Sequence, residues 1–228
     1  EIDVFDFDKT LIPFDSGSRF WLFCLVHNPW IVFCLPYQVA VMLLYIIGIK
    51  NLTFAKGRFF CFVRFIKLEK NVTKFWDKYE GTVFDWFKNE DRERPAVVIS
   101  ASPDFLLNEI CSRLNVYKLI CTVHNPKNGR IIGKNCKREE KIRRFNEEVG
   151  RCRVVNVCSD SLKSDKWIFS MGENCFHIQK NGEKFFLDLK AINALILRRA
   201  GVRHIEISDA CTMCQPNRFW SHRVTRGD

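Results

Sequence analysis

Two aspartates near the start of the chain have the spacing of a reactive pair. In the stretch IDVFDFDKTL, Asp6 and Asp8 end an apolar run and Thr10 follows two residues later. Alternate residues of a β-strand share one face, so the two carboxylates would project together from the strand's carboxyl end. Open α/β sheets bind ligands at that edge. The pair therefore indicates phosphoryl transfer, in which one carboxylate attacks phosphorus and the other moves protons.

A second strand is predicted within residues 96–104, where the run AVVISASPD is rich in β-branched residues and ends in hydroxyl groups. We expect Ser102 to cap a following helix, with Pro103 at its first position. The free N–H groups at the helix start, together with the Ser100 hydroxyl, would hold phosphate oxygens. A capped helix after a strand is common. This segment indicates a phosphate site only because it follows Asp6 and Asp8 in the sequence.

A positive charge is the next requirement, because a phosphoryl site with several carboxylates needs a fixed cation. A strand is predicted over 117–122, then a hairpin through the turn at 125–129 up to residue 137, and then a helix over 138–149. Lys141 is the expected cation and Lys137 the substitute. Alternatively, these lysines are solvated helix charges that pair with neighbouring glutamates.

A third strand, predicted within residues 152–158, is again followed by acidic side chains. Asp160 at the strand tip and Asp165 in the next turn would complete an oxygen-rich site for Mg²⁺, which prefers carboxylate and water ligands. Acidic residues in such loops are more often helix caps or turn formers. The pair is thus a candidate metal site only in combination with Asp6 and Asp8.

The most apolar segment, residues 20–49, carries no formal charge apart from a possible proton on His27. A helix over its last twenty residues would rise about 30 Å, the thickness of a bilayer's hydrocarbon core. Pro29 and Pro36 interrupt a straight span. We expect membrane contact as a kinked span, a re-entrant hairpin or an interfacial helix, with a buried helical hairpin as the alternative. Aromatic anchors and a basic flank accompany it: Trp21, Trp30, Tyr37, Tyr45, Lys50, Lys56, Arg58, Arg64 and Lys67.

Residues 51–95 continue as amphipathic helix, and a polar run over 88–95 leads from it into the second strand. Large apolar side chains recur near helical spacing and are expected to form core: Phe59, Phe60, Phe62, Phe65, Ile66, Phe75, Trp76, Tyr79, Val83, Phe84 and Phe87. A helical block is therefore inserted between two strands of one α/β unit.

Composition limits the class of protein. The chain has 228 residues, 47% of them hydrophobic, and a formal net charge of +10, which suits an anionic partner. Eleven irregularly spaced cysteines, several inside apolar runs, favour a reducing cytosolic setting, and no secretory leader is expected. No nucleic-acid-binding motif is visible, so we expect no nucleic-acid partner. A nonenzymatic membrane protein would leave the acids at strand ends unexplained.

The order of these motifs resembles the haloacid dehalogenase-like (HAD) superfamily over residues 1–183. The resemblance implies an α/β fold: a Rossmann-like parallel sheet formed by residues 1–14 and 96–183, with residues 15–95 as a helical type I cap. The stretches GRIIGKNCKREEK and CSDSLKSD are similar to the phosphoserine phosphatase-like branch (subfamily IB), which includes bacterial phosphatidylglycerophosphatase C.

This resemblance implies roles for the candidate residues. Asp6 would be the nucleophile that forms an aspartyl-phosphate, Asp8 the general acid and base, Ser100 a phosphate ligand and Lys141 the charge-balancing lysine. Mg²⁺ would be held by Asp6, the Asp8 backbone carbonyl and Asp160, with Asp165 in support. In this chain Asp165 lies five residues after Asp160 instead of the commoner four.

The end of the chain, residues 184–228, resembles a different family, the polyphenol oxidase or laccase-domain proteins that include purine nucleoside phosphorylases. The order LDL, helix, AGV, strand, DACTMC and FWSHR carries this resemblance. The family's metal-binding His and Cys residues belong to an upstream part that this chain lacks. Cys211 and Cys214 have no second pair, which disfavours zinc. We expect a short appended α/β fragment without activity of its own.

The expected function is Mg²⁺-dependent phosphomonoester hydrolysis on a membrane lipid phosphate such as phosphatidylglycerophosphate. The expected location is the cytoplasmic face of the cell membrane, with anionic lipid as a further partner. The alternatives are a small-molecule phosphatase of phosphoserine type, or a truncated or fused laccase-domain nucleoside phosphorylase without its metal site.

Overall fold

A computed structural model describes residues 1–88, 92–161, 164–181, 184–186, 194, 197–198 and 200–206. The chain divides into two compact units, Glu1–Leu187 and Asp188–Asp228, and all candidate catalytic residues belong to the first. Most of the predicted C-terminal fragment, including Cys211 and Cys214, lies outside the described residues. The boundaries predicted for core, cap and fragment stay predictions.

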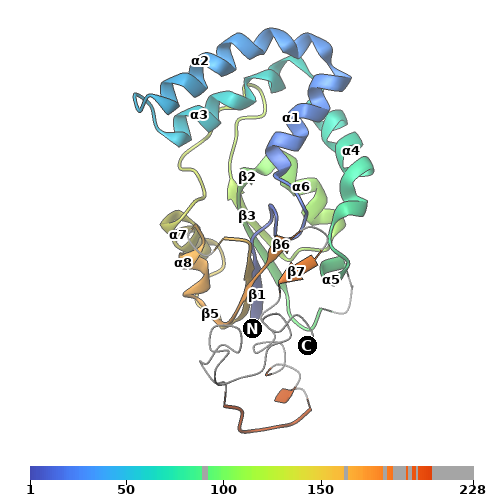
Figure 1. Cartoon of the computed structure of the whole chain (residues 1–228), viewed down its shortest axis with the longest axis vertical. Coiled ribbons are helices and arrows are strands. Elements are labelled where there is room, and N and C mark those ends of the chain that lie inside the picture. The colour runs from blue at the N-terminus through green and yellow to red at the C-terminus, as the bar shows by residue number, and fades with distance from the viewer. Residues whose placement is uncertain are drawn as a thin grey trace, which may run out of the picture. The chain divides into compact units, whose positions relative to one another are not determined.

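The first unit contains a five-stranded parallel sheet, which confirms the predicted α/β class (Figure 1). Its order is β3-β2-β1-β4-β5, so β1 is central and lies between β2, which contains Ser100, and β4, which precedes Asp160 and Asp165. The strands are β1 (Ile2–Phe5), β2 (Ala96–Pro103), β3 (Lys118–Thr122), β4 (Val154–Ser159) and β5 (Gly172–His177). Because parallel strands end at one edge, this order brings the acidic segments that follow β1 and β4 together.

Helices cover both faces of the sheet, which explains why its strands are apolar runs without alternation. On one face, Val4 and Val157 share a buried cluster with residues of α7 (Glu139–Glu148) and α8 (Lys166–Phe169). On the other, Val98 packs in a cluster with α6 (Asp104–Arg113). The sheet therefore provides a rigid floor for the loops at its carboxyl edge.

The block between β1 and β2 is helical, as predicted, and its helices α1, α2 and α3 lie beyond the carboxyl edge of the sheet (Figure 1). We call it the cap. Its elements are α1 (Ser16–His27), η1 (Pro29–Cys34), α2 (Leu35–Ile46), α3 (Leu52–Phe59), η2 (Phe60–Phe65), α4 (Leu68–Tyr79), η3 (Glu80–Thr82) and α5 (Asp85–Lys88).

The aromatic stripe predicted as core is buried at most of its positions, but Phe65 is an exception with 54% of its surface exposed. The best-anchored member is Trp76 of α4, which is fully buried. Its indole Nε1 donates a hydrogen bond to the Leu106 carbonyl of α6 at 2.7 Å. Its ring also meets the Phe7 ring edge-on, with centroids 6.0 Å apart. The cap helix α4 thus packs directly against the segment between Asp6 and Asp8.

The apolar segment 20–49 is not a buried hairpin, so that alternative is wrong. Within it, Pro29–Ile46 is long and apolar enough to cross a membrane by length and composition, with a mean hydropathy of 1.8, and only 22% of it is buried. The segment bends where α1 ends, at Asn28, whose side-chain amide donates to Asn71 Oδ1 of α4 at 2.8 Å. One side of the segment is therefore fixed to the cap and the other faces outward.

One local prediction is also wrong. Strand β2 continues through Pro103, which is the N-cap of α6, so Ser102 is the penultimate strand residue and not a helix cap. The hairpin predicted through the turn at 125–129 is present as a short antiparallel pairing: the bridge His124–Ile131 is flanked by backbone hydrogen bonds from the Asn125 N–H to the Arg130 carbonyl at 2.8 Å and from the Ile132 N–H to the Val123 carbonyl at 2.9 Å. The final sheet strand ends at His177, and Gln179 begins an antiparallel pair, β6 (Gln179–Asn181) with β7 (Lys184–Phe186).

A turn of the core contacts the cap. At the turn's end the Gly129 N–H donates to the Asn125 carbonyl at 2.8 Å. Gly129 has φ +72°, and a Cβ built there would lie 2.1 Å from the carbonyl oxygen of Phe60 in η2. Both the left-handed conformation and the close approach require glycine. The turn therefore fixes the cap against the core on the α3–η2 side.

Candidate active site

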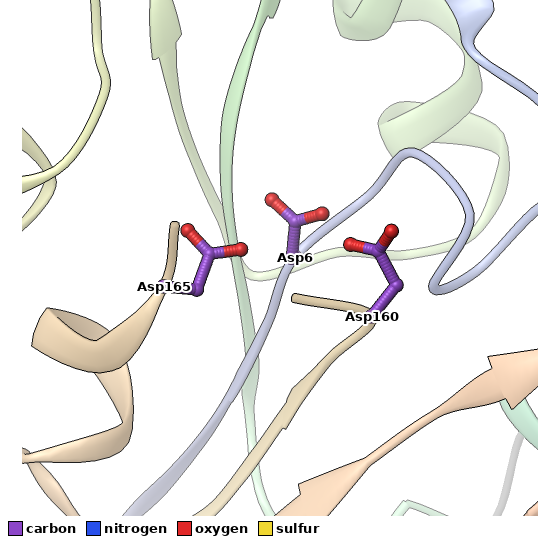
Figure 2. A group of neighbouring side chains, drawn as sticks. All are labelled: Asp6, Asp160 and Asp165. Carbon is purple, nitrogen blue, oxygen red and sulfur yellow. The ribbon is translucent and has the colours of Figure 1, made fainter. Parts of the chain in front are cut away.

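Asp6, Asp160 and Asp165 meet at the carboxyl edge of the sheet. Asp6 follows β1, and its backbone N–H donates to the Cys158 carbonyl of β4 at 2.9 Å, which fixes it beside that strand. Figure 2 shows the three carboxylates projecting to the same side, Asp6 from the end of β1, Asp160 from the end of β4 and Asp165 from the start of α8. One oxygen of each lies within 4.8 Å of those of the other two. Asp6 and Asp160 are 154 positions apart in the sequence, and the fold brings them into one cluster.

Lys141 is the cation of this cluster. It lies in the first turn of α7, is 3% exposed, and its Nζ is 2.7 Å from Asp6 Oδ1 and 2.7 Å from Asp165 Oδ1. The alternative that this residue is a solvated helix charge is therefore wrong. Lys137 is only half-buried and lies just before the helix. Of the two lysines predicted, Lys141 has the geometry to balance the charge of two carboxylates.

Asp8 has a different set of partners. Its Oδ1 accepts the Ser16 backbone N–H at 2.7 Å, and its Oδ2 accepts the Ser102 hydroxyl. The Ser16 hydroxyl donates in turn to Ser102 Oγ at 3.1 Å. Between the two aspartates and Ser16, Lys9 adopts φ +60°, a conformation that turns the chain sharply. Asp8 is thus held between the start of the cap helix α1 and the end of β2.

Ser100 is buried beside this arrangement, and its Oγ accepts the Ser102 backbone N–H at 3.1 Å. A serine hydroxyl has one donor and two acceptor sites, so this contact leaves its proton for another acceptor. That is the capacity expected of a phosphate ligand at this edge.

Three supporting hydroxyl groups were not assigned from the sequence. Thr10 Oγ1 donates to Asp6 Oδ2 at 3.4 Å and accepts the Asp160 backbone N–H at 2.9 Å, so it links the first and last acidic loops. Ser159 Oγ donates to Asp165 Oδ2 at 2.6 Å. The third, the Ser16 hydroxyl, donates to Ser102 Oγ, whose own hydroxyl donates to Asp8. A hydroxyl at a strand or helix end is too common a signal to identify such residues without the fold.

Burial sets the protonation of the cluster. It raises the pKa of Asp6 to about 7, with the Asp165 carboxylate adding to the rise and the Lys141 ammonium opposing it. Burial, and then the Asp15 carboxylate, raise the pKa of Asp8, against the hydrogen bonds from Ser102 and Ser16. A carboxyl group whose pKa is raised towards neutrality can both donate and accept a proton during a reaction.

Burial also raises the pKa of Asp160, with a further contribution from Asp165. For Lys141, burial alone would lower the pKa, but the carboxylates of Asp6 and Asp165 outweigh it and the net direction is upward. The lysine is therefore charged.

The cluster fits a divalent cation. Three carboxylates face one ammonium group, so ionised acids exceed the fixed positive charge. Hard oxygen ligands within 4.8 Å of one another are the donor set that Mg²⁺ prefers. Asp165 belongs to the cluster in spite of its five-residue spacing from Asp160.

Several solved structures are similar to this chain, and the first of them shows a likeness of fold alone. A protein of unknown function from Bordetella pertussis Tohama I matches with a TM-score of 0.53 at 20% identity, covering 64% of this chain and 72% of that one. A phosphoserine phosphohydrolase-like protein from Francisella tularensis matches with a TM-score of 0.45 at 16% identity, covering 69% and 76%. A substrate-bound phosphoserine phosphatase complex matches with a TM-score of 0.42 at 15% identity, covering 77% and 84%. No curated protein matches the chain at a significant level.

Two family models match the sequence. Residues 153–228 match the multi-copper polyphenol oxidoreductase laccase model, which confirms the resemblance of the C-terminal segment and extends it upstream into β4. Residues 4–163 match the haloacid dehalogenase-like hydrolase model, a stretch that contains β1 to β4, the cap, Asp6 and Lys141. This chain belongs to the haloacid dehalogenase-like hydrolase family.

Proposed function

We propose that this protein is a Mg²⁺-dependent phosphomonoesterase that works through an aspartyl-phosphate on Asp6. The observation that carries the proposal is the buried Lys141 ammonium, which contacts both Asp6 and Asp165 at 2.7 Å within a cluster of three carboxylates. An ammonium group in this position holds the Asp6 carboxylate in place and offsets the charge of an incoming phosphate.

The reaction divides into two displacements. In the first, an Asp6 oxygen forms a bond to phosphorus, the bond from phosphorus to the substrate's alkyl oxygen breaks, and Asp8 gives its proton to that oxygen. In the second, Asp8 takes a proton from water, the water oxygen bonds to phosphorus, and the bond to Asp6 breaks. Asp8 suits both steps because its pKa is raised and its carboxylate is oriented by Ser16 and Ser102.

The remaining residues bind charge. Asp6, Asp160 and the Asp8 backbone carbonyl would hold Mg²⁺, with Asp165 in support, and the ion would neutralise phosphate oxygens as negative charge develops. Ser100 would donate its hydroxyl proton to a phosphate oxygen. Lys141 lies on the opposite side of Asp6 from Thr10, since the two donate to different oxygens of its carboxylate.

For the substrate we propose a membrane lipid phosphate such as phosphatidylglycerophosphate, and for the location the cytoplasmic face of the membrane. The outward-facing apolar surface of Pro29–Ile46 and the net charge of +10 support this choice, because together they suit an anionic amphiphile. A small phosphate ester such as phosphoserine is the alternative, since the buried cluster alone places no demand on the leaving alcohol.

The test compares three substrates with Mg²⁺ present: a generic aryl phosphate, the lipid phosphate and phosphoserine. Purified wild-type chain is assayed beside Asp6→Asn and beside Asp85→Asn, a control aspartate of the cap whose side chain is 98% exposed. We expect Asp6→Asn to lose on the order of 10⁴-fold in kcat, as removal of a catalytic carboxylate does elsewhere, and Asp85→Asn to match wild type.

Two further readouts sharpen this test. Chelation of Mg²⁺ should abolish turnover, and its re-addition should restore it. Mass spectrometry of acid-quenched enzyme should find the phosphoryl group on the peptide that contains Asp6. Wild-type turnover no higher than that of Asp6→Asn on all three substrates would overturn the proposed chemistry.

A further inference from the structure

A hollow lies between the cap and a turn of the core, and none of the cluster carboxylates lines it. Its volume is about 430 Å³, and η1, α2, α3, η2 and the core turn that ends at Gly129 all contribute to it. Three arginines and three aromatic residues dominate its lining: Arg58, Arg64, Arg130, Phe33, Tyr37 and Phe65. We call it the arginine cleft. Neither the cluster aspartates nor Lys141 lines it.

Among the described residues, no carboxylate compensates the charge of the cleft. No Asp or Glu lines it, and within the described part of the chain no salt bridge involves any of its three arginines. Arg58 instead stacks on the Phe54 ring, 3.5 Å from its centroid. By contrast, Arg113 and Arg153 each contact two or more carboxylates. Guanidinium groups can each contact two phosphate oxygens at once, so three of them lining one hollow suit a phosphate group.

The rim of the cleft is apolar and faces outward. Phe33 is 84% exposed and Phe65 54%, and Tyr37 is exposed beside them. Along α2 the exposed surface continues through large aliphatic residues: Val39, Met42, Leu43 and Ile46. A contiguous apolar surface of this extent marks an interaction site. Its position next to unpaired arginines matches a surface that is anionic and apolar at once, which is the headgroup region of an acidic bilayer.

The packing of α2 favours lying on a bilayer over crossing it. Helix α3 runs beside α2, and Gln38 Nε2 of α2 donates to the Phe59 carbonyl of α3 at 2.7 Å (Figure 1). At the other end of the segment, Trp30 Nε1 of η1 donates to the Phe65 carbonyl at 2.9 Å. A spanning α2 would carry α3 with it, and α3 contains Lys56 and Arg58, charges that are costly in hydrocarbon.

We propose that the arginine cleft binds the phosphate groups of anionic phospholipids while the exposed face of η1 and α2 inserts among the headgroups, so that the cap docks on the bilayer. The inference rests on the membrane contact within the proposed function and is independent of the chemistry at Asp6. It identifies the docking surface and makes its partner an acidic lipid surface.

The experiment measures co-sedimentation of the full chain with two kinds of vesicle, phosphatidylcholine alone and phosphatidylcholine mixed with phosphatidylglycerol. The test variant combines Arg58→Gln, Arg64→Gln and Arg130→Gln. The control variant combines Arg143→Gln, Arg151→Gln and Arg153→Gln, which removes the same formal charge from other elements. Thermal unfolding of each variant establishes that it is folded before binding is compared.

We expect wild type and the control variant to prefer the phosphatidylglycerol vesicles, and the test variant to bind them about a hundredfold more weakly, a loss of one basic contact per arginine. The inference is overturned if the folded test variant binds as wild type does. It is equally overturned if wild type shows no preference for acidic vesicles, or remains in the supernatant with both.

Asp6→Asn separates the two proposals. Its binding to acidic vesicles should equal that of wild type, since Asp6 does not line the cleft. If wild type binds acidic vesicles through the three arginines but hydrolyses no phosphate ester, the proposed chemistry fails and the docking inference stands. If it hydrolyses aryl phosphate but ignores vesicles, the chemistry stands and the docking inference fails.

Discussion

The carboxyl edge of the sheet and the outer face of the cap satisfy their charges in opposite ways. At the edge, a buried ammonium contacts two carboxylates and each carboxylate has a further hydroxyl donor. In the arginine cleft, between the cap and the core turn, three arginines line one hollow without a carboxylate, beside apolar side chains that face outward. Buried charges must be paired within the protein, whereas exposed charges can stay unpaired until another molecule binds.

The difference separates the region proposed for catalysis from the region proposed for membrane binding. The charged and hydroxyl groups at the carboxyl edge form a closed network of contacts, so removing any one side chain changes the environment of the others. Under the docking proposal the arginines of the cleft bind groups outside the chain, so substitutions there should change what the protein binds and leave its folding almost intact. Four substitutions test this contrast, each with a matched control.

Lys141→Met should have the largest effect. It leaves the buried carboxylates of Asp6 and Asp165 without their cation, and we expect kcat on aryl phosphate to fall by about 10³-fold. The free energy of unfolding should fall by about 3 kcal/mol, because a broken buried pair leaves uncompensated charge. Steady-state kinetics and urea denaturation measure the two effects. The control is Lys118→Met, whose pair with Glu148 at 3.1 Å is half-exposed; equal losses in both variants would contradict a closed network at the edge.

Gly129→Ala should be next, with a loss of about 3 kcal/mol in the free energy of unfolding from left-handed strain and overpacking together. Its Cβ would meet the Phe60 carbonyl at 2.1 Å. Gly133 has a similar φ of +76° but nothing within 4 Å of a built Cβ. Gly133→Ala should therefore show the strain alone, about 1 kcal/mol. Similar losses in the two variants, measured by urea denaturation, would mean that the turn does not fix the cap.

Ser102→Ala should lower kcat by about tenfold, the usual size of losing an orienting hydrogen bond to a reactive group. Its hydroxyl positions Asp8, so KM should change little. The control is Ser112→Ala, an exposed serine near the end of α6. A change confined to KM would show that Ser102 binds substrate and does not position Asp8.

Ile46→Ser should have the smallest effect on folding. Ile46 is 70% exposed on α2, so we expect the free energy of unfolding to change by less than about 0.5 kcal/mol. Val41 on the same helix is 4% exposed, and Val41→Ser should cost about 2 kcal/mol. A loss at Ile46 as large as that at Val41 would show that the outer face packs against other parts of this chain.

The sheet, the inserted helices and the acidic cluster could be predicted because their signals are local. The ends of parallel strands converge whatever the loops do, which brings Asp6 and Asp160 together, whereas Asp8 lies beyond the end of β1 and bonds to Ser16 and Ser102. The choice between Lys137 and Lys141 was not local. It depends on how the chain enters α7, where Arg138 adopts φ +56° and the first helical turn brings Lys141, not Lys137, to Asp6.

The remaining misses also come from tertiary packing. Ser16 reaches Asp8 only because α1 starts at that point, and Ser102 does so because β2 runs two residues further than its turn-like sequence suggests. Phe65 fits the helical stripe, yet it lies in the short helix η2, whose different period turns it outward. Hydrophobic spacing cannot distinguish an apolar side chain that is buried in the core from one that is exposed on the surface.

The contacts of the buried Trp76 indole divide the cap into two parts that differ in local stability. Because Trp76 bonds to α6 and packs against Phe7, α4 cannot separate from the sheet without exposing the support of the catalytic strand. In native-state amide exchange, α4 should therefore open together with the strands, as part of one cooperative unit. Helix α2, with its outer side chains uncovered, belongs to a unit of lower protection. The cap thus behaves as a fixed lower layer and a separable upper one, and only the upper layer is free to adapt to a surface without disturbing the chemistry.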